Sequence, residues 1–321
     1  MLILDRSQTR ELLRLGPCID TVEAAFARHG RGETLPVSRM HVESGAGVFH
    51  VTAGGLDSVF GIKSNGRFPP PGGEGGQRVS GAMLLQDAAS GRPLALLDSQ
   101  VITVLRTAAA TAVAVRHLAR PGSRRALLVG AGRQAPAQVE ALATVLRLEQ
   151  LAVWDVQPAS AERLAGHASS LGVPAHVPPS AAAGAQDSDV IVTVTPALAP
   201  VLRADEVPPG ALVVAIGADG PGKQEHEPAL LARSKVVVDV LEQAAASGEL
   251  AHALAAGLMA PEDVYAELGE IVAGAKPGRT SDGETIVFDA TGTALQDVAA
   301  ALVIVEAARA RGVGLEVALD E

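Results

Sequence analysis

Residues 127–142 read LLVGAGRQAPAQVEAL. An apolar run ends in two glycines separated by one alanine, and an alanine-rich amphipathic stretch follows. Gly130 permits a tight turn, Gly132 lets the backbone approach a phosphate, and Ala135 stands where a third glycine would allow close helix packing. The stretch therefore predicts a strand, a glycine turn and a helix whose N-terminus favours an anion.

The surroundings of the turn are typical of dinucleotide binding. A second apolar strand ends at Asp155, 23 residues after Gly132. A carboxylate there accepts hydrogen bonds from ribose hydroxyls and repels a 2′-phosphate, and residues 156–158 contain no arginine. We therefore expect the cofactor to be NAD, with NADP less favoured. The alternative is that the stretch is a tight turn that binds no ligand. The expected cofactor-binding residues are Gly130, Gly132, Gln134, Asp155, Thr193 and Thr195. The two threonines end a later strand, where threonine is also a common strand former.

Strand and helix patterns alternate on both sides of this turn. Several of the strands are continuous apolar runs, which is typical of a parallel sheet buried on both faces. The fold class is therefore α/β, with a Rossmann-type doubly wound parallel sheet over residues 120–293. The expected strands are 126–129, 151–155, 175–177, 190–194, 212–216, 236–240 and 285–288, and the expected helices include 134–146 and 160–171.

Residues 1–119 have an α+β pattern instead. Pro69–Gly76 is rich in Pro and Gly and should be a mobile loop. Ser99 is expected to cap the helix that follows it, and the helix Ala294–Ala310 is expected to pack back on this first domain. The expected extended segments are 2–4, 38–43, 47–52 and 60–64, with a helix through 18–27 and a hairpin of 79–86 and 93–98.

The composition is that of a globular protein. The chain has 321 residues, 48% of them hydrophobic, which allows two packed domains. A net charge of −10 and few aromatic residues argue against nucleic acid as a partner, because a duplex binder presents a basic face. No stretch approaches the roughly 18 uninterrupted apolar residues of a membrane span. Cys18 has no second cysteine and no signal peptide is evident, so we expect a cytoplasmic protein without a membrane partner.

Four stretches of the chain resemble the ornithine cyclodeaminase/μ-crystallin family. The resemblance implies a nicotinamide-binding Rossmann domain and a substrate-binding and dimerisation domain, built from residues 1–119 and completed by about 294–321. It also implies that this domain pairs with a second copy to form a dimer. The strand-rich N-terminal half is too small to close its own sheet, so we expect a homodimer or an assembly of dimers. Members include ornithine cyclodeaminases, alanine dehydrogenases, ketimine and pyrroline-2-carboxylate reductases, and a crystallin that binds thyroid hormone. The stretches are RTAAATAVAVRHLA at 106–119, GAGRQA at 130–135, IGADGPGKQE at 216–225 and FDATGTALQDVA at 288–299.

Arg106 lies in an otherwise apolar, alanine-rich segment. A buried guanidinium needs an anion, and its planar fork suits a carboxylate. A solvent-facing arginine is the alternative. The resemblance implies that Arg106 binds the substrate carboxylate, that Arg39 in PVSRMHV grips it too, and that Lys63 in FGIKSN lies close to the reacting carbon. Three converging cations in an acidic protein imply a small carboxylic acid as the ligand.

Asp219 follows an apolar strand in a Gly/Pro turn, at the edge where open α/β sheets bind ligands. From its surroundings alone it is an ordinary turn residue. The resemblance implies that it is the acid/base, which handles a proton at the amino or imino nitrogen or on an attacking water. Lys223 and Glu225 in the same loop are weaker candidates that could serve only to shape the turn.

His50 departs from the family pattern. The corresponding residue of ornithine cyclodeaminases, eleven residues after Arg39 and thirteen before Lys63, is a glutamate that holds the side-chain ammonium of ornithine. An imidazole cannot replace a carboxylate in that role, and the loss of one partner of a buried charge pair costs roughly 2 to 5 kcal/mol. His50 is therefore a candidate proton donor or polar substrate contact, and a packed strand residue is the alternative.

The first hypothesis is an NAD(P)-dependent oxidoreductase that transfers hydride between nicotinamide and the α-carbon of a small amino or imino acid. Arg39, Lys63 and Arg106 would bind the substrate, and Asp219, Lys63 and His50 would form the catalytic set. A cyclic imine reductase or an alanine-dehydrogenase-like reaction fits better than cyclodeamination. The alternatives are an ornithine cyclodeaminase, which forms proline and ammonia with recycled NAD, and a non-catalytic, cofactor-dependent binding protein. No metal is expected, because the histidines form no ligand pattern.

Overall fold

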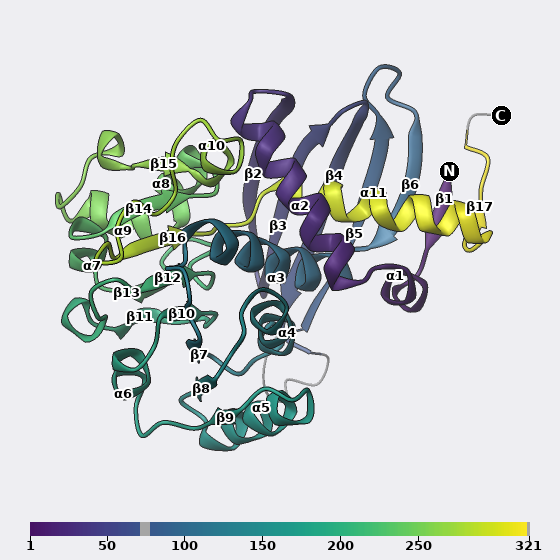
Figure 1. Ribbon diagram of the computed structural model, residues 1–321. Helices are drawn as coiled ribbons and strands as arrows, with labels where there is room; N and C mark the ends of the chain where they lie inside the picture. Colours follow the sequence, from purple (N-terminus) through teal and green to yellow (C-terminus); the bar gives the residue numbers. More distant parts are fainter. Residues whose placement is uncertain (71–77, 320–321) are drawn as a thin grey trace. The chain divides into compact units, whose positions relative to one another are not determined.

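The computed structural model describes residues 1–70 and 78–319, and the chain divides into two compact units (Figure 1). The first unit combines Met1–Ala109 with Thr293–Glu321, and the second is Ala110–Gly292. The division falls inside a helix, a little before the expected boundary at residues 119 and 120. The expected loop Pro69–Gly76 falls mostly on residues 71–77, which lie outside the described residues.

The first unit is built on a seven-stranded sheet with the order β17-β1-β6-β5-β4-β3-β2. β2 to β6 pair antiparallel with their neighbours in sequence, β1 pairs parallel with β6, and β2 forms an open edge. In the hairpin turn between β5 and β6, Asp87 accepts the Ser90 N–H at 2.8 Å and Gly91 has a φ of 73°. The strands predicted for this half of the chain are thus confirmed. They are β1 Leu2–Leu4, β2 Thr34–Ser44, β3 Gly47–Leu56, β4 Val59–Phe68, β5 Arg78–Asp87 and β6 Pro93–Asp98, whereas β17 Leu315–Glu316, which completes the sheet, was not predicted.

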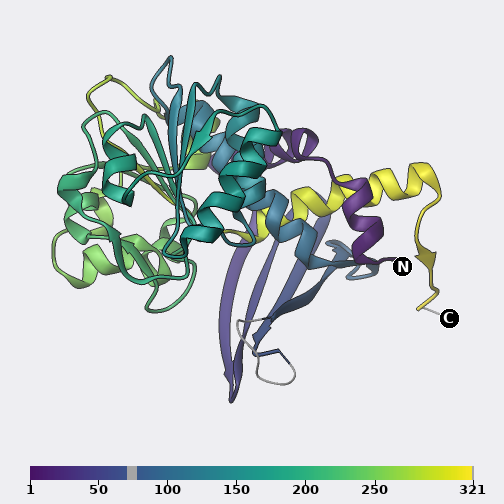
Figure 2. The ribbon, with the colours of Figure 1, turned by 90° about the horizontal axis from the view of Figure 1, so that it is seen from below.

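Helix α11 (Ala294–Arg311) packs on α2 (Leu15–Gly30) and on β3 and β4, as expected for the C-terminal helix (Figure 2). Glycines in the sheet make room for it. A Cβ at Gly54 would lie 3.0 Å from Ala294 Cβ, and a Cβ at Gly61 would lie 2.5 Å from Val298 Cγ2. This close approach lets the first turn of α11 reach side chains of β3 and β4. A short helix, α1, precedes α2 at Arg6–Leu12.

Helix α3 (Ser99–Leu118) begins in the first unit and ends in the second. The prediction that Ser99 caps it is wrong. The Ser99 hydroxyl donates to Asn65 Oδ1 at 2.5 Å, and Asp98 instead accepts the Gln100 N–H at 2.9 Å. A buried asparagine on a neighbouring strand competes successfully for the hydroxyl. By length and composition α3 could cross a membrane, but 67% of its apolar window is buried inside the protein, as in the core helix of a globular domain.

The second unit contains an eight-stranded parallel sheet with the order β15-β14-β16-β12-β10-β7-β8-β9. This confirms the doubly wound Rossmann-type fold. The chain runs outward from β7 through β8 and β9 and then returns to β10 on the other side of β7. Ligands of open α/β sheets bind at the carboxyl ends of the strands at such a reversal. The strands are β7 Arg125–Val129, β8 Gln150–Trp154, β9 Ala175–His176, β10 Val190–Thr193, β12 Leu212–Ala215, β14 Lys235–Val238, β15 Ala266–Glu267 and β16 Ile286–Asp289.

A pair of short parallel strands, β11 (Leu198–Leu202) and β13 (Gln224–His226), was not expected. Their sequences contain proline or charged residues in place of an apolar run, so no periodic pattern predicts them. β13 brings Glu225 and His226 into the interior, where both are fully buried. The helices of this unit include α4 Ala135–Val145, α5 Pro158–Ser170, α6 Ala181–Gln186, α7 Pro228–Ala232, α8 Leu241–Ser247, α9 Glu249–Ala255 and α10 Leu268–Val272, with 3-10 turns η1 Ala204–Glu206 and η2 Pro261–Asp263.

Candidate active-site residues

The glycine turn lies at the carboxyl end of β7, beside the reversal of strand order. Gly130 has a φ of 102°, and its N–H donates to Trp154 O at 2.8 Å. A Cβ on Gly130 would lie 2.9 Å from Val194 O and 3.0 Å from Thr195 Cγ2. Glycine is therefore required both by the left-handed conformation of the turn and by its contact with the segment that follows β10.

Asp155 braces the same turn. Its Oδ2 accepts the Ala131 N–H at 2.7 Å and its Oδ1 accepts the Gln157 N–H at 2.8 Å. A carboxylate offers about four lone-pair positions, so Asp155 retains acceptor capacity for a ribose hydroxyl. Gln134 is the N-cap residue of α4, and no atom lies within 4 Å of a Cβ added at Gly132. The structure thus brings the expected residues of the turn together with this carboxylate.

Glu225 connects the carboxyl ends of β10 and β12. Its Oε1 accepts the Thr195 N–H at 2.6 Å, and its Oε2 accepts the Gly217 N–H at 2.7 Å and the Thr193 hydroxyl at 2.8 Å. Burial raises the pKa of Glu225, and these hydrogen bonds oppose the rise. Thr193 is fully buried with its hydroxyl committed to Glu225, so it supports the edge from inside, whereas Thr195 lies beside the glycine turn.

Asp219 lies in the loop between β12 and β13. Its backbone N–H donates to Gly217 O at 2.9 Å, and its carboxylate forms an ion pair with Lys223. Lys223 Nζ also donates to Gly217 O at 3.3 Å, and the Lys223 carbonyl accepts the His252 Nε2–H at 2.7 Å. Lys223 therefore shapes the turn, and the Asp219 side chain remains 45% exposed.

Two further buried carboxylates, Glu249 and Asp289, lie near the carboxyl ends of these strands. Glu249 accepts the backbone N–H groups of Glu225 at 2.7 Å and of His226 at 3.2 Å, and Asp289 accepts the Leu250 N–H at 2.8 Å. Burial raises the pKa of Glu249 well above its usual value and raises the pKa of Asp289 to about 7. Burial lowers the pKa of His226 to about 4, so its ring is neutral at neutral pH. Within residues 1–70 and 78–319, no group of three or more His, Cys, Asp and Glu side chains is arranged to hold a metal ion.

In the first unit, Asp297 contacts two of the expected substrate-binding cations. Its carboxylate lies 2.6 Å from Lys63 Nζ and 3.0 Å from Arg106 Nε, and it accepts the Thr52 hydroxyl at 3.1 Å. The contact with Arg106 is an ion pair without the alignment of a hydrogen bond. The Lys63 and Asp297 side chains are only 4% and 1% exposed. Two positive charges and one negative charge leave an excess of one positive charge, which suits one carboxylate ligand.

Gln296 holds Arg106 from a second side, because Arg106 Nη1 donates to Gln296 Oε1 at 2.9 Å. Burial lowers the pKa of Lys63 to about 8, although the charge of Asp297 opposes the shift. Burial acts to raise the pKa of Asp297, yet the charges of Lys63 and Arg106 keep it below its usual value. Lys63 is therefore charged at neutral pH and loses its proton in the mildly alkaline range.

The strand register puts the other expected residues on the same face of the sheet. Arg39, Thr52 and Lys63 stand opposite one another on β2, β3 and β4. His41 and His50 form the next row, two residues or about 7 Å further along the strands. Their rings pack edge to face with centroids 4.5 Å apart. His50 therefore lies next to the row of cations and contributes no carboxylate there.

Asp297 and Gln296 are the residues of this set that the sequence reasoning missed. Both belong to FDATGTALQDVA, the stretch quoted for its resemblance, but no role was assigned to either side chain. The signal that could have found them is an acidic residue in the first turn of an otherwise apolar helix. A buried carboxylate in such a helix requires a cationic partner.

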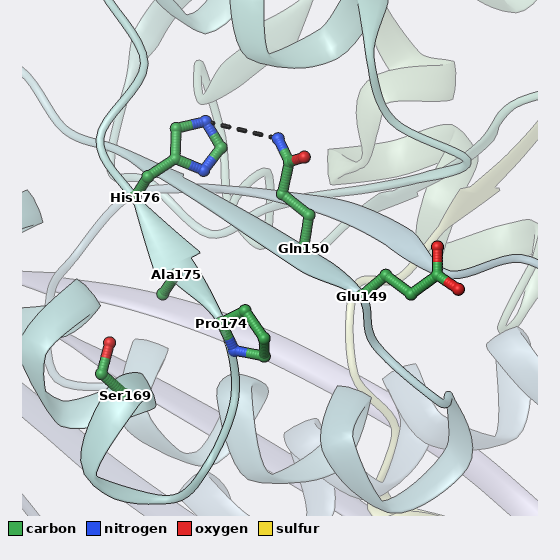
Figure 3. A pocket seen from close by; sticks show the side chains of 6 residues that line it. All are labelled: Glu149, Gln150, Ser169, Pro174, Ala175 and His176. Carbon is green, nitrogen blue, oxygen red and sulfur yellow. Dashed lines mark hydrogen bonds between the residues drawn. The ribbon is translucent and has the colours of Figure 1, made fainter.

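A surface hollow of about 560 Å³ lies elsewhere in the second unit (Figure 3). Gln150 and Ala175 belong to the amino ends of β8 and β9, so the hollow opens at the amino edge of the sheet. Open α/β sheets bind their ligands at the opposite edge. The hollow is therefore a poor candidate for the cofactor site. Its lining residues are Glu149, Gln150, Ser169, Pro174, Ala175 and His176.

Comparisons with known proteins agree over nearly the whole chain. The sequence model of the ornithine cyclodeaminase/mu-crystallin family matches residues 1–312. The iminosuccinate reductase of Paracoccus denitrificans is 36% identical over 322 residues, 99% of each chain. Among solved structures, an archaeal alanine dehydrogenase dimer with bound NAD has a TM-score of 0.94 at 36% identity, covering 99% of both chains. The Δ1-pyrroline-2-carboxylate reductase of Thermococcus litoralis, in complex with NADH and L-proline, has a TM-score of 0.92 at 31% identity, covering 99% of this chain and 100% of that one.

Proposed function

Because the chain belongs to the ornithine cyclodeaminase/mu-crystallin family, we propose that it is an NAD-dependent oxidoreductase of small amino or imino acids. Hydride passes between the nicotinamide and the α-carbon of the substrate, in a cyclic-imine reductase or an alanine-dehydrogenase-like reaction. Whole-chain similarity to an alanine dehydrogenase and to two imino acid reductases supports this class of reaction.

The observation that carries the proposal is the cluster of Lys63, Arg106 and Asp297. Its three charged side chains are largely buried and carry an excess of one positive charge, which favours an organic carboxylate as the ligand. Asp297 and Gln296 hold the Arg106 guanidinium in one orientation, so little side-chain freedom is lost when a substrate binds. Arg39 stands in the same cross-strand row and adds a third cation.

The second unit fits a dinucleotide. The N-terminus of α4 and the glycine turn favour a pyrophosphate, and the Asp155 carboxylate has acceptor capacity for the adenosine ribose while repelling a 2′-phosphate. Bound NAD supplies the hydride acceptor, and NADH supplies the hydride donor. The residues that would hold it are Gly130, Gly132, Gln134, Asp155 and Thr195, with Thr193 supporting them from the interior.

Asp219 is proposed to manage the proton that accompanies the hydride. Reduction of an imino acid adds a hydride to the α-carbon and a proton to the nitrogen, and oxidation of the amino acid removes both. The Asp219 carboxylate exchanges this proton with the substrate nitrogen, and the ion pair with Lys223 holds the side chain in its loop. Lys63 is proposed to act near the reacting carbon, and His50 as a polar contact or proton donor for the substrate.

Ornithine cyclodeamination is the second candidate. The family resemblance and the cofactor turn are shared by both reactions, but the ammonium of ornithine needs a carboxylate in the row beside the cations. His41 and His50 occupy that row, which favours the oxidoreductase. Formation of proline and ammonia from L-ornithine with catalytic NAD would establish the second candidate.

The first experiment follows NADH oxidation with Δ1-pyrroline-2-carboxylate, with iminosuccinate, and with pyruvate plus ammonia. Cofactor binding is measured separately through Trp154, the one tryptophan of the sequence, because NADH bound near the glycine turn will quench its fluorescence. Turnover with one of these acids is expected, and R106M should raise its KM by a factor of about 100 while R92M, at the exposed β5–β6 turn, has no effect. NADH binding without turnover of any acid would contradict the proposal.

A cofactor-dependent binding protein without turnover is the third possibility, and D219A separates it from an enzyme. A binding protein should keep its affinity for the acid in D219A. An enzyme should lose kcat by several orders of magnitude while its affinity for NADH remains close to the wild-type value.

The chain is further proposed to form a homodimer, or an assembly of dimers, in the cytoplasm. The open edge strand β2 and its neighbour β3 expose Met40, Val42 and Phe49, an apolar face that a second copy would cover. The lone Cys18, which has no partner for an intrachain disulfide, suits a reducing compartment. Light scattering at micromolar concentration should give at least twice the mass of the chain, and M40D/V42D should give the mass of a monomer.

A further inference from the structure

Glu225 is a fully buried carboxylate on which three hydrogen-bond donors converge. Two of them are the backbone N–H groups of Thr195 and Gly217, at 2.6 and 2.7 Å, and the third is the Thr193 hydroxyl at 2.8 Å. Thr195 belongs to the segment after β10, and Gly217 belongs to the segment after the neighbouring strand β12. One side chain therefore fixes the distance between two loops at the carboxyl edge of the sheet.

The first of these loops supports the glycine turn. A Cβ at Gly130 would lie 3.0 Å from Thr195 Cγ2 and 2.9 Å from Val194 O, so the turn rests directly on this segment. The Thr195 hydroxyl also accepts the Ala197 N–H at 3.2 Å and so shapes its own loop. A displacement of Thr195 therefore moves the surface on which the turn lies.

The second loop carries Asp219. The Asp219 N–H donates to Gly217 O at 2.9 Å, and Lys223 contacts both the Gly217 carbonyl and the Asp219 carboxylate. A Cβ at Gly217 would lie only 2.4 Å from Glu225 Cδ, so the backbone passes directly over the carboxylate. A displacement of Gly217 is thus transmitted to Asp219 through at least two contacts.

The chemistry of these donors requires a carboxylate at position 225. A backbone N–H can only donate, so both oxygens of the side chain must accept. The amide of a glutamine has one oxygen, and in either orientation its NH₂ group would face a backbone N–H. The Glu225 backbone is itself fixed, because its N–H donates to Glu249 Oε1 at 2.7 Å.

We propose that Glu225 is a positioning residue, which sets the cofactor-binding edge through Thr195 and the acid/base loop through Gly217 without touching cofactor or substrate. This role rests on the proposed NAD-dependent function. In this role, both the affinity for the cofactor and the rate of the chemical step depend on one buried side chain.

The test compares E225Q with E227Q. Glu227 lies two residues further on and accepts one backbone N–H, that of Ala204 at 2.8 Å, away from either loop. A buried N–H that faces the amide NH₂ group will displace Thr195 or Gly217, so E225Q should raise the NADH Kd, read from Trp154 quenching, by a factor of about ten or more. E225Q should also lower kcat but leave the KM of the acid within a factor of about two, because the binding cations belong to the first unit. E227Q should match the wild type in all three.

The outcomes separate the inference from the proposed function. If the wild type fails to bind NADH, the proposed function fails. If the wild type binds NADH and E225Q matches it in Kd and kcat, only the role of Glu225 is overturned. If E225Q does not fold, the role of Glu225 is tested by measuring amide hydrogen exchange in the cofactor-free wild type. The Thr195 and Gly217 amides should exchange as slowly as those inside β10 and β12, and fast exchange at both would overturn the proposal.

Discussion

Lys63 Nζ lies 2.6 Å from Asp297 Oδ2, so a strand from the first fifth of the chain is joined to its last long helix by a buried ion pair. Arg106 reaches the same carboxylate from a third element. A single acidic side chain thus stabilises the packing of α11 on the sheet and also balances the charge of two groups proposed to bind substrate.

Replacement of this acid, D297N, should weaken both fold and binding. Removal of one partner of a buried ion pair costs roughly 3 to 5 kcal/mol, because the remaining charge stays without compensation. We expect a large loss of unfolding free energy in urea titration and a higher KM for the acid at pH 7.5. E33Q breaks the exposed pair between Arg31 and Glu33 and serves as the control, with an unchanged urea midpoint. Equal midpoints for D297N and E33Q would contradict this account.

The second prediction concerns pH. The pKa of Lys63 is lowered to about 8, chiefly by burial, and the ammonium form is the one that attracts a carboxylate. The KM of the acid should therefore be constant below pH 7 and rise as the pH passes through about 8. In K63R the guanidinium remains charged, and the bend near pH 8 should disappear. A wild-type KM that stays constant from about pH 6.5 to 9.5 would rule out a binding role for the Lys63 charge.

Asp289 makes stability depend on pH in the unusual direction. Burial raises its pKa from 3.8 to about 7, so the folded protein holds a proton that the unfolded chain releases. Its contribution is fully present below pH 3.8 and is lost as the pH rises through 7. From pH 5 to 8 the loss should be roughly 3 kcal/mol. D289N cannot titrate, so its unfolding free energy should fall less over this range, and parallel curves for the two proteins would disprove the assignment.

The contact between α11 and β4 depends on the absence of a side chain at Gly61. A Cβ there would lie 2.5 Å from Val298 Cγ2, so G61A should lower the unfolding free energy by roughly 1 to 3 kcal/mol. V298A removes the clashing methyl groups, and G61A/V298A should lose less than the sum of the two single variants. Gly16 has no neighbour within 4 Å of its Cβ position and lies in helix α2, where alanine is the better helix former, so the control G16A should not lower the unfolding free energy. Strict additivity of G61A and V298A would show that the two positions do not compete for space.

Cys18 offers a chemical probe of the first unit. It is buried in α2, and burial raises the pKa of its thiol to about 12. The thiolate is the reactive form, so a disulfide reagent at pH 8 should leave the native protein unlabelled and label it fully in urea. Labelling of the native protein at the rate of the unfolded chain would show that α2 opens readily.

Most of the sheet of the second unit was predictable because several of its strands are apolar runs, which are typical of a parallel sheet covered on both faces. The short strand β15, Ala266–Glu267, was not predicted. The contacts of the polar residues could not be predicted in this way. Serine is a common helix-capping residue, but the Ser99 hydroxyl donates a hydrogen bond to Asn65, which lies on strand β4. The sequence around Ser99 gives no sign of this contact, because Asn65 comes close to Ser99 only in the folded protein.

The candidate site was predictable in the same uneven way. Gly130 and Asp155 could be proposed from the sequence because turn chemistry and spacing are local features of sequence. Asp297 was missed because its importance comes from Lys63 and Arg106, which lie far away in the chain. Glu225 was noticed only as a turn residue, since the two N–H groups that define it come from loops that lie together only in the folded sheet.

The first unit takes six of its seven strands from residues 2–98, whereas helix α11, which covers them, comes from residues 294–311. During synthesis, residues 1–109 leave the ribosome before α11 has been made. The apolar surface around Gly54 and Gly61 therefore remains exposed until α11 can pack on it. The intervening residues 110–292 can complete their own sheet in that interval. The first unit therefore cannot complete its fold until α11 has been synthesised, and a chain that stops before residue 294 would lack the helix that covers this sheet.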